Sequence, residues 1–260
     1  MIQEEKILRR VTEIGNGAHI FAPKEWLHEE VIIIRVPRKN PKEEILKLIY
    51  PHLDKIIAVF LFGSYARNEQ EMDSDMDVFV VSSEKFKIRA KDIEVIVIPE
   101  DKLETAKRLN PVLFYSMLQE ARPIINPSYL EKLKQEKVRF DYFKDFLKGT
   151  ESSIKSIQEI MEMDRKLKNK EAPGSVIYSL ILRLRGIFII NFLLNKKKYS
   201  KKAFLAWLIK NLEVDFDNIH KVYRAFRDNK KISGKVSVKD AESLLSFIIK
   251  EIEKLSKKIK

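Results

Sequence analysis

Cysteine is absent from this chain of 260 residues, and histidine is rare. Without cysteine there are no disulfides, zinc–thiolate sites, iron–sulfur clusters or thiol nucleophiles. The four histidines are scattered along the sequence, and none belongs to a recognisable metal site or catalytic triad. Other side chains must therefore carry any reaction. The histidines are His19, His28, His52 and His220.

An uninterrupted apolar run of membrane-spanning length is also missing. The longest apolar stretch, from Val176 to Leu194, contains Arg183 and Arg185. A bilayer disfavours two central arginines, so a buried helix is predicted there. These arginines either reach water or buried acids, or they line a cleft for a substrate. Residues 1–5 are polar and unlike a signal peptide, so we expect a soluble, cytoplasmic protein with no membrane partner.

Charge is unevenly distributed along the chain. Lys and Arg number 50 against 38 Asp and Glu, a formal net charge of +12. Residues 1–127 hold 19 basic and 21 acidic residues, which leaves 31 basic and 17 acidic residues for 128–260. The basic half could contact an anionic partner such as RNA through its phosphates. Amphipathic helices with solvated, lysine-rich faces are the favoured reading, because no helix shows the clear basic stripe of a nucleic-acid footprint.

Three regions differ in their patterns, and together they predict an α+β fold. Residues 1–38 form a short β element, with a hairpin turn at 15–17, a strand at 18–21 and another at 31–36. So few strands cannot make a core alone, so this element needs the rest of the chain or a second copy. Residues 39–127 alternate helix and strand, which predicts a small mixed β-sheet with flanking helices. Residues 128–260 show helical spacing throughout and predict an all-α bundle.

The elements of the second and third regions can be placed by their patterns and end signals. Asn40 and Pro41 are typical of a helix start, and Asn110 and Pro111 open another helix that runs to Glu120. Predicted strands cover 56–62, 76–81 and 93–98. Predicted helices of the bundle cover 129–148, 151–169, 175–195, 200–212, 217–228 and 237–259.

A short motif follows the first strand of the predicted sheet. Gly63 and Ser64 end a continuous apolar run and open a short helix. A backbone without Cβ lets a phosphate approach closely, and the Ser64 hydroxyl adds a hydrogen-bond donor. A Gly-Ser pair alone is weak evidence, because it is more often just a turn.

Three acids follow on the next two strands. Asp75 and Asp77 are two residues apart, which on a strand places both on the same face about 6.6 Å apart along the axis. Glu94 lies between apolar residues in the third strand and needs a partner there. Carboxylates arranged in this way can share Mg²⁺, and paired cations stabilise the attacking and leaving oxygens of nucleotidyl transfer. Glu94 could bind metal, act as general base, or do both.

In combination, these residues resemble the nucleotidyltransferase superfamily related to DNA polymerase β, in its minimal branch. The resemblance covers about residues 40–127. It departs at Asn68, where the family prefers Gly, and at Glu94, where Asp is more frequent. The matching residues are Gly63, Ser64, Ala66, Arg67, Ser74, Asp75 and Asp77.

The resemblance implies a role for each matching polar residue. Gly63, Ser64, Arg67 and Ser74 would contact a nucleoside triphosphate, with Arg67 bracing the phosphate loop or a neighbouring acid. The catalytic, Mg²⁺-binding residues would be Asp75, Asp77 and Glu94.

Two weaker resemblances concern the flanking regions. Residues 14–34 are similar to the AbrB/MazE swapped-hairpin element, which implies a homodimer through residues 8–36, and DNA binding as a less favoured reading. The helical region looks like the HEPN or kanamycin-nucleotidyltransferase C-terminal bundle. Arg224 and Arg227 have no histidine after them, so the HEPN ribonuclease pattern is not met.

The sequence therefore predicts an enzyme, with one alternative. The enzyme would move a nucleoside monophosphate from a nucleoside triphosphate, ATP by preference, to a hydroxyl of RNA, protein or a small molecule, with Mg²⁺ as cofactor. The alternative is a non-catalytic dimeric regulator of antitoxin or DNA-binding type. Three mutually repelling acids count against the alternative, because a disused site has no need for them.

Overall fold

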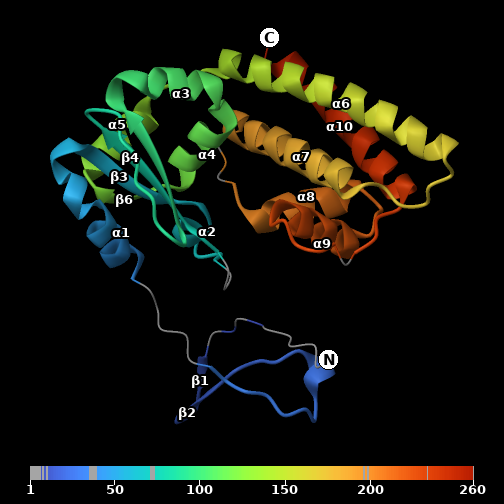
Figure 1. The fold of residues 1–260 in the computed structure, drawn as a ribbon, viewed down its shortest axis with the longest axis horizontal. Coiled ribbons are helices and arrows are strands. Elements are labelled where there is room, and N and C mark those ends of the chain that lie inside the picture. The colour runs from blue at the N-terminus through green and yellow to red at the C-terminus, as the bar shows by residue number, and fades with distance from the viewer. Residues whose placement is uncertain are drawn as a thin grey trace.

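A computed structural model shows three parts in the molecule (Figure 1): a small hairpin, a sheet with its helices, and a group of longer helices. The predicted α+β class is confirmed. The division into domains at 38/39 and 127/128 stays a prediction. The structure describes residues 7, 9, 11–34, 40–70, 74–195, 197, 199–232 and 234–259.

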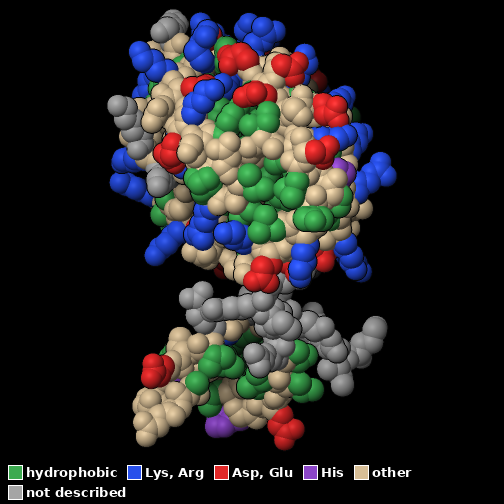
Figure 2. Space-filling model, turned by 90° about the vertical axis from the view of Figure 1, so that its left-hand side faces the viewer, with side chains coloured by type: hydrophobic (Ala, Val, Ile, Leu, Met, Phe, Trp, Pro, Cys, Tyr) green, Lys and Arg blue, Asp and Glu red, His purple; other side chains and the backbone are tan. Residues whose placement is uncertain are grey.

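The N-terminal part is a two-stranded hairpin that lies apart from the rest of the molecule (Figures 1 and 2). Strands β1 (Thr12–Ile14) and β2 (Gly17–His19) pair antiparallel around the predicted turn. The strand predicted over 31–36 is wrong for Val31–Ile34, which take no strand structure, while residues 35 and 36 lie outside the described part. Residues 31–34 have a β-branched pattern, but they pair with no strand in the part of the chain that the structure describes.

Four strands form the mixed sheet, in the order β5-β4-β3-β6. Strand β3 pairs antiparallel with both β4 and β6, and β4 pairs parallel with β5. The end of β3 therefore lies beside the beginnings of β4, β5 and β6, at a single edge of the sheet. The strands are β3 (Ile56–Phe62), β4 (Met76–Ser82), β5 (Ile93–Pro99) and β6 (Arg122–Ile125).

The alternation of side chains assigns each strand residue to one face of the sheet. Phe60 and Phe79 lie in the core that the sheet shares with the long helices, whereas Val59 and Val80 lie in a smaller core with Ile45. Helix α1 (Pro41–Ile49) covers that smaller core, and Asn40 caps its first turn as predicted. Odd residues of β4 thus face the helical part of the molecule.

Short elements complete the sheet region, and some of them were not predicted. Helix α4 (Pro111–Glu120) has the predicted bounds, but α3 (Leu103–Leu109) and β6 were missed. Helix α2 (Gly63–Arg67) follows β3 directly, and α5 (Pro127–Gln135) packs against β3 and β6.

The helical part contains two long helices whose boundaries differ from the prediction. The predicted helices 129–148 and 151–169 are wrong, because α5 ends at Gln135 and α6 (Phe143–Lys166) runs through Gly149. The apolar face of α6 continues on both sides of this glycine, so packing holds the helix together there. The remaining helices lie close to prediction: α7 (Gly174–Leu194), α8 (Lys201–Asn211), α9 (Phe216–Arg227) and α10 (Val238–Lys258).

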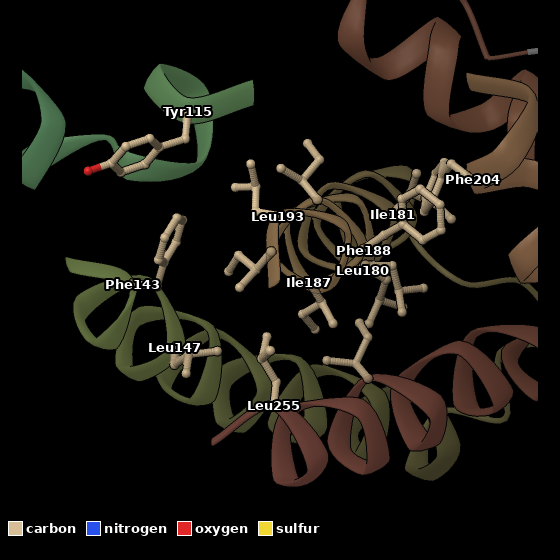
Figure 3. Close-up of a cluster of buried hydrophobic side chains, with 14 of the residues drawn as sticks. Tyr115, Phe143, Leu147, Leu180, Ile181, Ile187, Phe188, Leu193, Phe204 and Leu255 are labelled. Carbon is tan, nitrogen blue, oxygen red and sulfur yellow. The ribbon is translucent and has the colours of Figure 1, made fainter. Parts of the chain in front are cut away.

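Helix α7 lies at the centre of the main core. Leu180 and Ile187 point toward α6 and α10, which carry Leu147 and Leu255 (Figure 3). By length and composition α7 is long and apolar enough to cross a membrane, and in this structure most of it is buried. Tyr115 of α4 contacts Phe143 of α6, with ring centroids 5.8 Å apart. The sheet and the bundle therefore share one continuous core.

Candidate active site

Asp77 and Glu94 lie side by side where β3 ends and β4 and β5 begin, and Asp75 lies just before β4. Asp77 lies directly opposite Phe62 in the β3–β4 pair, and it is the register partner of Glu94 in the β4–β5 pair. Paired residues in a sheet project from the same face. Asp77 and Glu94 therefore both point toward the helical part of the molecule.

Gly63 forms a close contact with this acidic strand end. Its φ angle is +71°, a region that residues with a side chain rarely adopt. A Cβ atom on Gly63 would lie 1.8 Å from Oδ2 of Asp77. Glycine is therefore required both by the turn and by the carboxylate beside it.

Asp77 lies in an excess of negative charge. Its pKa is raised to about 6, first by burial and then by the charges of Glu94 and Glu120. The charge of Arg67 lowers this pKa, and the exposed Asp75 raises it only weakly. A cation would relieve this repulsion, because it stabilises the ionised carboxylate.

The donor set fits Mg²⁺ in its chemistry. Asp75, Asp77 and Glu94 offer only carboxylate oxygens, which are the ligands that hard cations prefer. Within the described ranges, no three acidic or histidine side chains already converge as a metal group. Asp75 and Glu94 are exposed and Asp77 is half-buried, so the two outer side chains can reorient. Their metal-binding role stays a prediction.

The serines and the end of α2 frame the corner. Ser64 is half-buried in α2, where its carbonyl accepts a hydrogen bond from the amide of Glu69 at 2.9 Å. Ser74 is half-buried immediately before Asp75. Asn68 closes α2 in the left-handed conformation, with φ +58°. Asparagine tolerates this conformation better than most residues. The turn can therefore form with Asn68, at the position where the family that the sequence resembles prefers glycine.

Arg67 pairs with two acids, neither of which the sequence identified as its partner. Its Nε donates to Glu69 at 2.7 Å, and its Nη1 pairs with Oε2 of Glu120. Glu120 also accepts a hydrogen bond from the Gly63 amide at 2.8 Å. Glu120 is the last residue of α4 and lies just before β6, whose pairing with β3 was not predicted. The sequence therefore did not indicate that Glu120 lies at the site.

Tyr199 connects this corner to the helical bundle. Its ring contacts two guanidinium groups, with Arg67 5.5 Å and Arg185 5.4 Å from the ring centroid. Burial raises the pKa of the Tyr199 hydroxyl. Arg183, by contrast, donates to Ser153 within the bundle at 3.0 Å. Of the two arginines in α7, Arg185 is thus the one that reaches the candidate site.

A shallow pocket of about 410 Å³ opens beside this junction. Its floor is apolar, and two lysines and one acid stand around it. It lies between the end of α2 and the first three turns of α8. The lining residues are Glu69, Lys201, Lys202, Leu205, Ala206 and Ile209.

Comparison with known families matches the sheet region. Residues 43–135 match the family described as "Polymerase beta, Nucleotidyltransferase". The match spans strands β3 to β6, together with α1 to α5. No curated protein sequence matches the chain.

Solved structures give distant likenesses. A spectinomycin adenyltransferase AAD(9) from Enterococcus faecialis, with ATP and spectinomycin, has 13% identity and a TM-score of 0.46 over 82% of this chain and 98% of its own. A nucleotidyltransferase-like protein from Exiguobacterium sibiricum has 12% identity and a TM-score of 0.37, over 82% and 74%. A toxin-antitoxin structure with AMP-PNP has 16% identity and a TM-score of 0.28, over 46% and 98%. Such values carry no argument about the reaction of this chain.

Proposed function

We propose that this chain, in which residues 43–135 form a nucleotidyltransferase domain of the polymerase beta family, transfers a nucleoside monophosphate from ATP to a hydroxyl group. The observation that carries the proposal is the junction of Gly63, Asp77 and Glu94. A backbone corner that admits no Cβ lies against a carboxylate surrounded by other acids. Phosphate and cation binding are what such an arrangement suits.

In the proposed reaction, one group of residues orients the phosphates and another accepts the proton of the acceptor. The acceptor oxygen forms a bond to the α-phosphorus of ATP, and the bond from that phosphorus to the oxygen leading to the β-phosphate breaks, which releases pyrophosphate. The corner at Gly63 and Ser64 orients the phosphates through Ser64, because the Gly63 amide already donates to Glu120. Glu94, exposed at the mouth of the site, takes the proton of the acceptor hydroxyl.

Magnesium completes this proposal without changing these assignments. Asp75, Asp77 and Glu94 would hold it. When bound, Mg²⁺ supplies positive charge that offsets the negative charge of the phosphates. Burial and the neighbouring acids disfavour the ionised form of Asp77, and a bound cation would stabilise that form. Cation binding and ionisation of Asp77 therefore favour each other.

The acceptor is proposed to occupy the pocket between α2 and α8. Lys201 and Lys202 favour an acceptor that carries negative charge, and the apolar floor favours a flat or aliphatic portion. RNA, a protein side chain and a small molecule all remain acceptors to be compared by experiment. The protein is proposed to act in the cytoplasm.

The N-terminal element is proposed to form a homodimer with a second copy. Among the described residues of the range 8–36, large apolar side chains are exposed, including Phe21 at 71% and Ile32 at 90%. Figure 2 shows apolar side chains gathered on this small body. A two-stranded hairpin is at best marginally stable alone, so a second copy is the proposed source of its missing core.

An assay with α-labelled ATP tests the enzymatic proposal. Purified protein is incubated with labelled ATP, Mg²⁺ and either total RNA or lysate protein, and label transfer is measured. We expect transfer by the wild-type chain and a loss of about 10²–10³-fold in Asp77→Asn, since one charge-stabilising group is removed. Asp101→Asn, which changes an exposed aspartate beside Lys102, is the matched control and should transfer label normally.

The opposite result would favour the regulatory alternative. Full transfer by Asp77→Asn would contradict the assigned site. Absence of transfer with every acceptor, together with salt-dependent retention of DNA, would instead indicate a non-catalytic binding protein.

A further inference from the structure

Glu120 is a largely buried acid whose two carboxylate oxygens are both engaged. Oε1 accepts a hydrogen bond from the Gly63 amide at 2.8 Å, and Oε2 pairs with Nη1 of Arg67. Only 12% of its side chain is exposed. An acid bound in this way is placed to hold other groups, because each of its oxygens already contacts a neighbouring part of the site.

The sheet topology explains how Glu120 reaches Gly63 across 57 residues of sequence. Strand β6 runs antiparallel to β3, and Leu61 is the register partner of Arg122. Glu120 lies two residues before Arg122, and Gly63 lies two residues after Leu61. The pairing of the two strands therefore brings the end of α4 against the start of α2.

Gly63 is consequently fixed from two sides. Asp77 lies against its α-carbon, where no Cβ fits, and Glu120 holds its amide. Any rotation of the corner breaks one of these contacts. The same Glu120 carboxylate fixes the position of the Arg67 guanidinium, which also contacts Glu69 and the face of the Tyr199 ring.

The charge balance supports a positioning role. A bare carboxylate next to a phosphate site would repel the nucleotide. Here the charge of Glu120 is paired with Arg67 at short range, while its oxygens still anchor the backbone. The pair therefore anchors the backbone while Arg67 offsets part of the charge of Glu120.

We infer that Glu120 is a positioning residue, which holds the Gly63–Ser64 corner and Arg67 in the arrangement that receives the phosphates of ATP. This inference rests on the proposed function. It adds a fourth acid to the site and gives it a task different from the other three. Removal of Glu120 is expected to weaken ATP binding more than it slows the chemical step.

The contact itself can be observed by NMR spectroscopy of the whole chain. Phe62–Gly63 is the only Phe–Gly pair in the sequence, so ¹³C-carbonyl phenylalanine combined with ¹⁵N-glycine selects the Gly63 amide alone. We expect this resonance to move upfield in Glu120→Ala, because the hydrogen bond to a carboxylate is lost. In Glu69→Gln, which removes the other acid on Arg67, the Gly63 resonance should stay in place.

Kinetics then separate positioning from a purely structural role. In Glu120→Ala we expect the KM for ATP to rise about 10- to 100-fold, with a smaller fall in kcat and an unchanged KM for the acceptor. Glu120→Gln keeps the size of the side chain and an oxygen for the Gly63 amide but loses the charge, so its KM should lie between wild type and Glu120→Ala. Glu131→Gln, an exposed glutamate on α5, is the matched control.

The outcomes distinguish this inference from the proposed function. If the Gly63 resonance of Glu120→Ala stays in place, or if the resonance moves but ATP affinity and KM stay within about twofold of wild type, Glu120 does not position the corner. If wild type transfers no label, yet ATP with Mg²⁺ shifts the Gly63 resonance in wild type and not in Glu120→Ala, the proposed function fails and the positioning role stands. A wild-type resonance that does not respond to ATP overturns the positioning role, and the label-transfer assay alone then decides the proposed function.

Discussion

At the scale of single residues, Asp77 makes the fold depend on pH. Its folded pKa of about 6 lies above the ordinary value of 3.8, so the native protein binds this proton more tightly than the unfolded chain does. Below pH 4 both states are protonated and Asp77 is not penalised. As pH rises from 4 to 6 the penalty grows, and above pH 6 it stays near its maximum of about 1–3 kcal/mol.

Asp77→Asn is therefore expected to stabilise the metal-free protein near neutral pH. The gain in the free energy of unfolding should be about 1–3 kcal/mol at pH 7.5, and it should shrink toward zero as pH falls to 4.5. Urea unfolding in the presence of a chelator, at both pH values, measures it. A variant less stable than wild type at pH 7.5 would show that Asp77 is not under electrostatic strain.

The sequence indicated most of the acids at the site, because their positions follow local rules. Asp75 and Asp77 flank the first residue of β4, and Glu94, the second residue of β5, is the register partner of Asp77. Glu120 and Tyr199 follow no such rule. Each reaches the corner through packing between segments far apart in the chain, which no local pattern encodes.

At the scale of elements, helix α7 holds the bundle together. Leu184 is fully buried in its centre, whereas Leu182, on the same helix, is 38% exposed. We expect Leu184→Ala to lower the free energy of unfolding by about 2–5 kcal/mol, because it leaves a cavity in close-packed surroundings. Leu182→Ala is the matched control and should cost less than about 1 kcal/mol.

Chemical denaturation of both variants tests this prediction. Equal effects would mean that α7 is not packed as described. The comparison also tests whether α7 is held by the protein core. In that case the stability loss depends on which face of the helix carries the alanine.

Elements with a strong periodicity of apolar residues were predictable from the sequence, and short or interrupted elements were not. The apolar run of β3 and the long pattern of α10 gave nearly correct bounds. Strand β6 has four residues and contains Pro123, which argues against a strand by its own chemistry. Pro123 is tolerated because β6 lies at the edge of the sheet.

At the scale of the whole molecule, the hairpin and its apolar surface bear on assembly. If residues 8–36 join two copies, the protein should sediment at twice its chain mass of 30.6 kDa. Ile33, 71% exposed on the described part of this element, is the position to change. Ile33→Lys is expected to give a monomer, since it places a charge in the interface.

Analytical ultracentrifugation measures this difference, and Leu109→Lys is its control. Leu109 is 70% exposed at the end of α3, far from the hairpin in sequence, and its substitution should leave the dimer intact. A wild-type chain that sediments as a monomer would contradict the proposed homodimer.

The position of β6 also has a consequence for synthesis of the chain. Strand β3 lies between β4 and β6, yet β6 is made about 60 residues after β3. Throughout that interval the most apolar strand of the sheet has one bare edge, which is the kind of surface that recruits other nascent chains. Conditions that slow translation between residues 63 and 122 should therefore raise the share of newly made protein that aggregates or engages chaperones.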